Sequence, residues 1–286
     1  MRSLLFVPGD SARKFEKART GPADALIIDL EDSVAPDRKD EARSITCGML
    51  GAERGAQKLF VRVNALDTGR TLGDLAATLP ARPDGVVLPK CESADQLRQV
   101  SLWLDGIEAA TGVVPGATSI IAIATETAAS IFGLGSYAGA TERLLGLMWG
   151  AEDLSASLGS TANKTGRTYH SPYRLARDLC LMGAAAAGVA AIDTVYTDIE
   201  DLEGLAEESA AARRDGFSCK AVIHPKHVEV VNAAFSPTDE EVAWARRIVD
   251  AFAADTGLGV IRIDGKMIDK PHLRAAEKIL SASGRP

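Results

Sequence analysis

Short apolar runs alternate with amphipathic stretches along the whole chain. Several runs are hydrophobic without polar alternation, which is typical of parallel strands buried on both faces. The stretches between them, such as 94–110, 202–215 and 240–255, have the spacing of amphipathic helices. We therefore expect eight strands, at Leu4–Pro8, Ala25–Glu31, Leu59–Asn64, Gly85–Lys90, Ile120–Glu126, Leu144–Gly150, Ile192–Thr197 and Ala221–His224.

Eight strand–helix units in 286 residues predict an α/β fold, a (β/α)8 TIM barrel with a C-terminal lid segment. A doubly wound open sheet is the alternative, but its glycine-rich phosphate turn is not found around Gly9 or Gly21. We assign residues 1–256 to a catalytic barrel domain. Residues 257–286 form an appendage with an apolar run, the hairpin signal Asp264-Gly265 and a final helix. The barrel does not need this segment, so we interpret it as a lid.

Composition limits the classes of function. Hydrophobic residues make up 46% and charged residues 25%, which is enough for a large core. The net charge of −7 argues against general nucleic-acid binding, although a local basic cluster could still hold an anion. We expect no membrane span and no signal peptide, because no apolar stretch has the required length. The four cysteines are scattered without metal spacing, which favours reduced thiols in a cytoplasmic protein.

Two acids, Glu126 and Asp153, each follow an apolar run that leads into small residues. A carboxylate at the carboxyl end of a buried strand is costly unless a metal ion, an arginine or a substrate compensates its desolvation. Two such acids on consecutive strand ends could hold one hard cation such as Mg²⁺ from the same side. The pair predicts an enzyme.

Other polar residues also concentrate where strands end, as a metal-assisted reaction on an anionic substrate requires. Arg62 could contact substrate or neutralise Asp29 or Glu31 across the barrel, and the pattern favours neither. Capping or loop anchoring is the favoured interpretation of Asp32, and Asp153 could also cap a helix. Two further residues belong to this group. Lys90 is best interpreted as a lysine whose side chain extends to solvent, and His224 as a structural strand end.

A set of motifs spread over nearly the whole chain is specific in combination. It comprises residues 2–9 (RSLLFVPG), 29–34 (DLEDSV), 61–64 (VRVN), 88–90 (LPK), 126–128 (ETA), 150–154 (GAEDL), 192–196 (IDTVY) and 222–225 (VIHP). With these motifs the chain resembles the citrate lyase β-subunit-like proteins of the HpcH/HpaI aldolase superfamily, close relatives of malyl-CoA and citramalyl-CoA lyases. The resemblance implies a TIM barrel, assembled as homotrimers or dimers of trimers. It also implies Mg²⁺-dependent making or breaking of the bond between an acyl thioester and a 2-oxo acid.

The resemblance implies roles for residues at the barrel mouth. Glu126 and Asp153 would be the direct metal ligands, and Arg62 would stabilise negative charge on the thioester and keto oxygens. The carboxylate of the oxo acid would be held by backbone N–H groups of three consecutive residues, Gly150, Ala151 and Glu152.

Two further sites follow from the same resemblance. The basic residues Arg13, Lys14 and Lys17 near the first loop would meet the phosphates of CoA. The tail motif 265–271 (GKMIDKP) is similar to the lid of the CoA-lyase branch, in which an aspartate completes the active site of the neighbouring subunit. The matching residue is Asp269, which would take a proton from the thioester in the synthetic direction.

The expected function is therefore a reversible lyase that cleaves a β-hydroxyacyl-CoA such as malyl-CoA or citramalyl-CoA into an acyl-CoA and a 2-oxo acid. One alternative is a citrate lyase β subunit that acts on a citryl thioester carried by an acyl carrier protein. Another is a malyl-CoA thioesterase with the same metal site. The lid motif favours the first. Glyoxylate, pyruvate and oxaloacetate all stay open as the oxo acid, because pocket volume decides between them.

Overall fold

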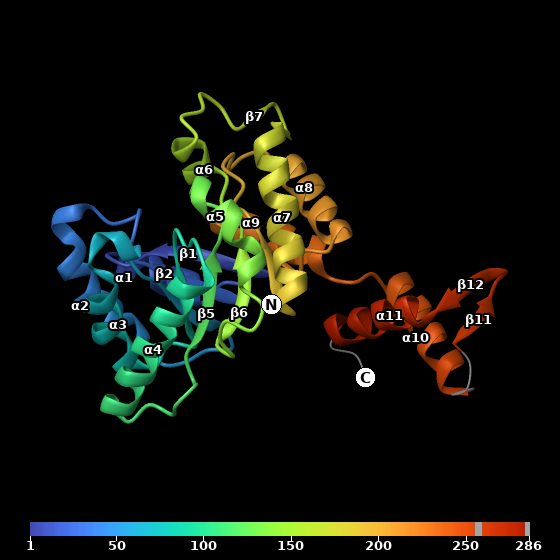
Figure 1. Ribbon diagram of the computed structural model, residues 1–286, viewed down its shortest axis with the longest axis horizontal. Helices are drawn as coiled ribbons and strands as arrows, with labels where there is room; N and C mark the ends of the chain where they lie inside the picture. The colour runs from blue at the N-terminus through green and yellow to red at the C-terminus, as the bar shows by residue number, and fades with distance from the viewer. Residues whose placement is uncertain (255–258, 284–286) are drawn as a thin grey trace. The chain divides into compact units, whose positions relative to one another are not determined.

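The computed structural model describes residues 1–254 and 259–283. The chain divides into two compact units, Met1–Asn232 and Ala233–Pro286 (Figure 1). We describe each unit by itself. Among the described helices, none combines the length and the apolar composition that crossing a bilayer would need.

Eight parallel strands of the first unit close into a barrel in the order β1-β10-β9-β6-β5-β4-β3-β2. They are β1 (Ser3–Pro8), β2 (Ala25–Asp29), β3 (Lys58–Arg62), β4 (Gly85–Leu88), β5 (Ser119–Ile123), β6 (Leu144–Met148), β9 (Ala190–Asp193) and β10 (Cys219–Val222). Every predicted strand is present, and the predicted TIM-barrel fold is confirmed. Most predicted runs end a few residues too late, because their polar final residues already belong to the loops at the carboxyl ends.

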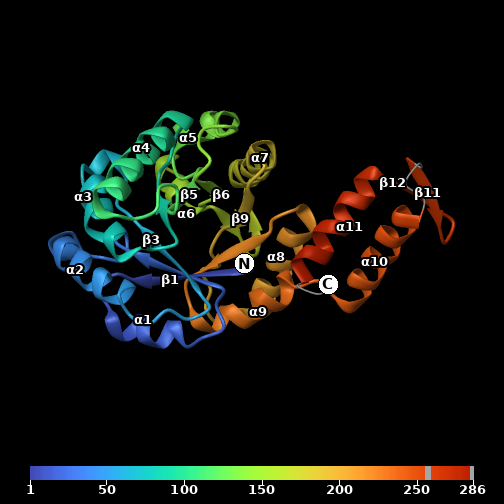
Figure 2. The same cartoon turned by 90° about the horizontal axis from the view of Figure 1, so that it is seen from below.

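Helices follow the strands, and α2, α3, α4 and α7 lie outside the strands in Figure 2. The helices of this part are α1 (Ala12–Arg19), α2 (Lys39–Leu50), α3 (Thr71–Thr78), α4 (Ala94–Thr111), α5 (Ala128–Gly133), α6 (Glu152–Ser157), α7 (Ser171–Ala187), α8 (Leu202–Asp215) and α9 (Pro225–Phe235). Four 3₁₀ turns lie at Pro36–Arg38, Leu66–Thr68, Leu79–Ala81 and Leu134–Ser136. The long polar segment after α6 contains a small hairpin, β7 (Lys164–Thr165) with β8 (Thr168–Tyr169).

Local signals explain where the helices begin and end. Ser93 precedes α4, and its side chain accepts a hydrogen bond from the backbone N–H of Gln96, as an N-cap serine does. The helix ends at Gly112, whose φ of 68° is available to glycine at little cost. These two residues fix the ends of α4, which agree to within one residue with the predicted helix at 94–110.

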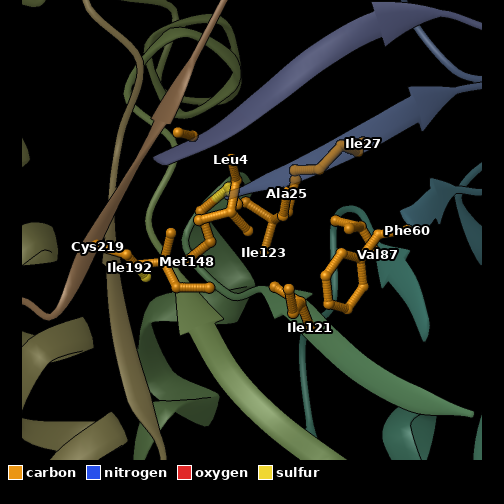
Figure 3. Packing of buried hydrophobic residues seen from close by; sticks show 11 residues of the cluster. Leu4, Ala25, Ile27, Phe60, Val87, Ile121, Ile123, Met148, Ile192 and Cys219 are labelled. Atoms are coloured by element: carbon orange, nitrogen blue, oxygen red, sulfur yellow. The ribbon is translucent and has the colours of Figure 1, made fainter. Parts of the chain in front are cut away.

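Inward-facing apolar side chains from all eight strands fill the barrel (Figure 3). The cluster comprises Leu4, Ala25, Ile27, Phe60, Val87, Ile121, Ile123, Met148, Ile192, Cys219 and Ala221. Since side chains two apart on a strand share a face, the same inward face continues from Ile27 to Asp29 and from Phe60 to Arg62. The register pairs Ile27 with Phe60 and Asp29 with Arg62. The core therefore leads directly into a charged layer at the carboxyl ends of the strands.

The second unit contains α10 (Asp239–Ala254), the hairpin β11 (Val260–Ile263) and β12 (Lys266–Asp269), and α11 (Lys270–Ser283). The hairpin predicted at Asp264-Gly265 is present, and both residues have positive φ, at 49° and 78°. A small core joins these elements, consisting of Ala245, Ile248, Phe252, Ile268 and Ala276. Helix α10 belongs to this unit, whereas the sequence analysis placed it with the barrel.

Candidate active site

A cavity of about 400 Å³ opens at the carboxyl ends of the barrel strands. Most of the polar strand-end residues of the sequence analysis line it, including both acids of the expected metal pair. The lining consists of Phe6, Val7, Pro8, Asp29, Asp32, Ser33, Arg62, Ile123, Glu126, Met148, Trp149, Gly150, Ala151, Glu152, Asp153, Thr194, Val195 and Ile223. Charged groups therefore stand above an apolar floor, as a site that orients a small anion requires.

Arg62 is held in place by carboxylates of the neighbouring strand. Its Nε and Nη2 donate to the two oxygens of Asp29, each at 2.7 Å, and its Nη1 lies 3.0 Å from Oε2 of Glu31. Its guanidinium also stacks over the ring of Phe6, 4.8 Å from the centroid. Burial alone would lower the pKa of Arg62, but the negative charge of Asp29 raises that pKa well above its ordinary value. Arg62 is therefore a permanent cation with a fixed orientation.

Lys90 does not extend to solvent, so that expectation was wrong. Its Nζ donates to Oε1 of Glu31 at 2.6 Å and lies 3.3 Å from Oδ1 of Asp153. Only 27% of its side chain is exposed. The reason is electrostatic: several carboxylates share this mouth and attract the ammonium group inward, which the sequence around Lys90 does not reveal.

Glu126 is the most perturbed acid of the cavity. Its side chain is buried, and its Oε2 accepts a hydrogen bond of 2.6 Å from the backbone N–H of Lys90. Burial, together with the negative charges of Asp153 and Glu31, raises the pKa of Glu126 from 4.5 to about 8. Such a carboxylate needs a further positive charge to be ionised at neutral pH.

Asp153 lies in the first turn of α6, where Ala151 rather than Asp153 occupies the N-cap position. One third of its side chain is exposed, so it faces the open cavity. Among the described residues, no three acidic, histidine or cysteine side chains form a metal site. Glu126 and Asp153 alone fit a cation that keeps several water or substrate oxygens, which is how Mg²⁺ is usually bound. Such a cation would compensate the buried negative charge of Glu126, and the raised pKa of this carboxyl is the observation that supports the fit.

Glycine at position 150 is required by the acid beside it. A Cβ atom there would lie 2.9 Å from Cγ of Glu126, too close for a real contact. The N–H of Gly150 already donates to Oγ1 of Thr125 at 2.9 Å. The N–H groups of Ala151 and Glu152 are better placed for an anion, because they lie at the start of α6, where a helix leaves donors without intrahelical partners.

The three basic residues that were expected near the first loop lie in helix α1 and line a second cavity of about 430 Å³. Arg13, Lys14 and Lys17 line it together with His224. Four further residues, Phe6, Val7, Pro8 and Ile223, line both this cavity and the first one. The two cavities therefore share a wall, and the charged site lies in the first cavity, on the other side of that wall from the basic residues. His224 was expected to be a strand end, but it lies in the bend between β10 and α9, because the strand ends at Val222; its Nδ1 accepts a hydrogen bond from the N–H of Lys226.

Asp269 belongs to the second unit, at the end of β12. Its carboxylate hydrogen-bonds the ring of His272 and accepts from the backbone N–H of His272 in the first turn of α11. The hydrogen bond from His272 lowers the pKa of Asp269, so this carboxylate is ionised at neutral pH.

Sequence reasoning missed two residues that shape the site. Phe6 supports the guanidinium of Arg62, and Trp149 is a buried wall whose Nε1 donates to Oδ1 of Asp193 at 2.6 Å. Asp193 also accepts from Lys220, which is fully buried, at 2.6 Å. Phe6 lies in the motif at 2–9 and Asp193 in the motif at 192–196, whereas Trp149 lies in none of the motifs.

A parallel (β/α)8 barrel with a guanidinium and two perturbed or cavity-facing carboxylates at its mouth defines the class of barrel enzymes that act on small anions. The family model for HpcH/HpaI aldolase/citrate lyase matches residues 2–225. The chain belongs to this family of aldolases and lyases, and within it to the citrate lyase β-subunit-like proteins.

Relatives with different assigned reactions are similar over almost the whole chain. Citrate lyase subunit beta of Escherichia coli K12 is 38% identical, over 98% of this chain and 92% of that protein. A (3S)-malyl-CoA thioesterase of Cereibacter sphaeroides is 37% identical, over 98% and 93%. The family is therefore shared by lyases and a thioesterase.

Solved structures match the fold. CitE of Mycobacterium tuberculosis, in complex with magnesium, acetoacetate and coenzyme A, is 35% identical with a TM-score of 0.79, over 99% of this chain and 98% of that chain. A citrate lyase of Burkholderia xenovorans has a TM-score of 0.87 at 22% identity, over 100% and 93%, and supports the fold alone.

Proposed function

We propose that this protein is a Mg²⁺-dependent carbon–carbon lyase that reversibly cleaves a β-hydroxyacyl-CoA, such as malyl-CoA or citramalyl-CoA, into an acyl-CoA and a 2-oxo acid. The observation that carries the proposal is the convergence of Arg62, Glu126 and Asp153 on one cavity. The complex of CitE with magnesium, acetoacetate and coenzyme A supports it, because that relative binds a cation, an oxo acid and CoA together.

Arg62 has the chemistry for the negative charge that develops during cleavage. Breaking the bond leaves an enolate on the acyl thioester while the hydroxyl carbon becomes a ketone. Of the five N–H groups of an arginine, Asp29 accepts two and Glu31 lies 3.0 Å from Nη1, so the donors that are left can face an enolate oxygen. Because its partners hold it rigidly, Arg62 needs no reorganisation when the charge appears.

Glu126 and Asp153 would hold the cation. When bound, Mg²⁺ makes the substrate hydroxyl more acidic and favours the ketone product. The chain's own contribution is to keep these two carboxylates on one side of the cavity. The N–H groups of Ala151 and Glu152 would orient the carboxylate of the oxo acid, with Gly150 allowing the close approach.

Arg13, Lys14 and Lys17 would bind the phosphates of CoA, since their cavity shares a wall with the charged site. This arrangement would let a thioester extend from one cavity into the other. We place the protein in the cytoplasm, where its four cysteines, all free, would remain reduced.

Asp269 would act as the base in the synthetic direction, supplied by a neighbouring subunit of a homotrimer or dimer of trimers. Its ionised carboxylate can accept a proton from the acyl methyl group, and exclusion of water would raise its basicity. We expect Asp269→Asn to keep Mg²⁺ and ligand binding and to lose turnover. Asp264→Asn, on the same hairpin but paired with Arg247, is the matched control and should turn over normally.

The test is incubation of the purified protein with acetyl-CoA or propionyl-CoA and glyoxylate, pyruvate or oxaloacetate, with and without Mg²⁺. Mass spectrometry would detect a metal-dependent β-hydroxyacyl-CoA adduct and identify the substrates. If the folded, Mg²⁺-binding protein forms no adduct from any pair, the stand-alone lyase is refuted.

Two alternatives have specific support among the relatives. The similarity to citrate lyase subunit beta favours a subunit that acts on a citryl thioester of an acyl carrier protein, in which case only a carrier-bound substrate would be cleaved. The similarity to (3S)-malyl-CoA thioesterase favours hydrolysis, in which case malyl-CoA would yield free CoA and intact malate. The same mass spectra separate all three.

A further inference from the structure

We propose that Lys90 is a built-in counter-ion of the metal site: its ammonium group pairs with the ligand carboxylate of Asp153 and competes with a divalent cation held by Glu126 and Asp153. This inference rests on the metal pair of the proposed function. It adds a role for a residue that neither the catalytic assignment nor the motif pattern explains.

Lys90 contacts both members of the metal pair. Its backbone N–H donates to Oε2 of Glu126 at 2.6 Å, and its Nζ lies 3.3 Å from Oδ1 of Asp153. The same Nζ donates to Oε1 of Glu31 at 2.6 Å and lies 3.9 Å from Oδ2 of Asp32. One residue therefore connects the two ligands and two further acids.

The backbone of Lys90 is in the left-handed region, with φ at 50°. A non-glycine residue pays of order 1 kcal/mol for this conformation, so it persists only where surrounding contacts enforce it. Here the conformation aims the N–H at Glu126 while the side chain reaches Asp153. Glycine would satisfy the backbone more easily, which indicates that the ammonium group has its own role.

The balance of charge explains why the ammonium group would compete with a metal ion. The acids at this mouth are Asp29, Glu31, Asp32, Glu126, Glu152 and Asp153, and the cations are Arg62, Lys90 and Lys39. Arg62 is committed to Asp29 by two hydrogen bonds, and Lys39 donates to the backbone carbonyls of Leu30 and Glu31. Lys90 is thus the described cation that pairs with Asp153.

The expected size of the competition follows from Coulomb's law. Even at the dielectric constant of water, a unit charge about 5 Å from a divalent ion changes its affinity by a factor of about ten. In a partly enclosed cavity the effective dielectric constant is lower and the factor is larger. Removal of the ammonium group should therefore tighten Mg²⁺ binding at least about tenfold, while repulsion among the acids weakens the metal-free fold.

Lys90→Gly tests this directly, because glycine adopts positive φ without strain and keeps the N–H that Glu126 accepts. Arg82→Gly is a matched control. Arg82 also has positive φ, at 56°, and also carries one positive charge, but it lies before β4, at the opposite end of the strand from Lys90. Lys90→Arg, which retains the charge, should restore an affinity close to that of the original protein. Lys90→Gln is the substitute if the glycine variant does not fold.

The measurements are the Kd for Mg²⁺ by titration calorimetry and the unfolding midpoint in EDTA and in Mg²⁺. For Lys90→Gly we expect a Kd at least about tenfold lower, a lower midpoint in EDTA and a larger rise on adding Mg²⁺. Arg82→Gly should leave both the Kd and the rise in midpoint on adding Mg²⁺ unchanged. Unchanged or weaker Mg²⁺ binding by a folded Lys90→Gly variant overturns the inference. A different outcome, no Mg²⁺ binding by the unsubstituted protein, would instead overturn the metal pair of the proposed function.

Discussion

Replacing Glu126 by glutamine should make the metal-free protein more stable while removing its affinity for Mg²⁺. The ionised carboxylate is buried near Asp153 and Glu31, and their negative charges together with burial raise its pKa to about 8. Glutamine has nearly the same shape and can still accept the hydrogen bond from the N–H of Lys90. It carries no charge, so the cost of ionising this position disappears.

The sign and size follow from proton linkage. Because the folded state binds this proton more tightly than the unfolded state, the carboxylate destabilises the fold progressively as the pH rises from 4.5 through about 8. A tenfold change in proton affinity corresponds to about 1.4 kcal/mol. The rise in the pKa of Glu126 from 4.5 to about 8 therefore sets an upper bound of about 5 kcal/mol on the destabilisation above pH 8. Since Lys90 and Asp153 can rearrange, we expect a smaller effect. Glu126→Gln should raise the free energy of unfolding by about 2 kcal/mol above pH 8 and by almost nothing near pH 5.

The assay is urea unfolding in EDTA at pH 5.5 and pH 8.5, with Mg²⁺ calorimetry on the same samples. Glu108→Gln is the matched control, because the pKa of Glu108 is shifted in the opposite direction. Although burial alone would raise it, hydrogen bonds from Arg143 and neighbouring groups lower the pKa of Glu108 to about 2. Its ionised form therefore stabilises the fold above pH 4.5, and the control should lose stability at both pH values. A Glu126→Gln variant that is less stable at pH 8.5, or equally changed at both pH values, would refute the reasoning.

Three other substitutions follow from individual contacts. Arg62→Lys cannot keep both hydrogen bonds to Asp29 and should lower kcat about 100-fold or more in steady-state assays with little change in the Kd for Mg²⁺; equal turnover would exclude Arg62 from charge stabilisation. Gly150→Ala should push Glu126 aside and weaken Mg²⁺ binding about tenfold by calorimetry, and an unchanged Kd would contradict this. Gly265→Ala, at a φ of 78°, should cost about 1 kcal/mol, seen as faster hydrogen exchange of the β11–β12 amides, and unaltered exchange would count against it.

Regular patterns in the sequence made the barrel predictable. Each strand is a short run of apolar residues that is buried on both faces, and such a run has few other stable environments in a chain of this length. The capping residues Ser93 and Gly112 likewise act on their immediate neighbours, so the bounds of α4 follow from local chemistry. Glu126 and Asp153 were recognisable because acids directly after apolar runs require compensation.

The behaviour of Lys90 and Arg62 depended on partners that are distant in the sequence. Local reasoning favoured solvent for Lys90, whereas Glu31 and Asp153 draw its ammonium group into the site. For Arg62 the sequence left an ion pair and a substrate contact open. The register of β2 and β3 places Asp29 opposite Arg62, which establishes the ion pair and leaves N–H donors for a ligand.

The sequence by itself determined the fold class, the positions of the strands and the two acids at neighbouring strand ends, because these depend on periodicity and on the local cost of burying charge. The tertiary structure decided how the charges at the mouth pair, why position 150 must be glycine, and that the cavity lined by the basic residues of α1 shares a wall with the site. Electrostatic pairing and close approach depend on distances between segments far apart in the chain. Those distances exist only once the barrel has closed.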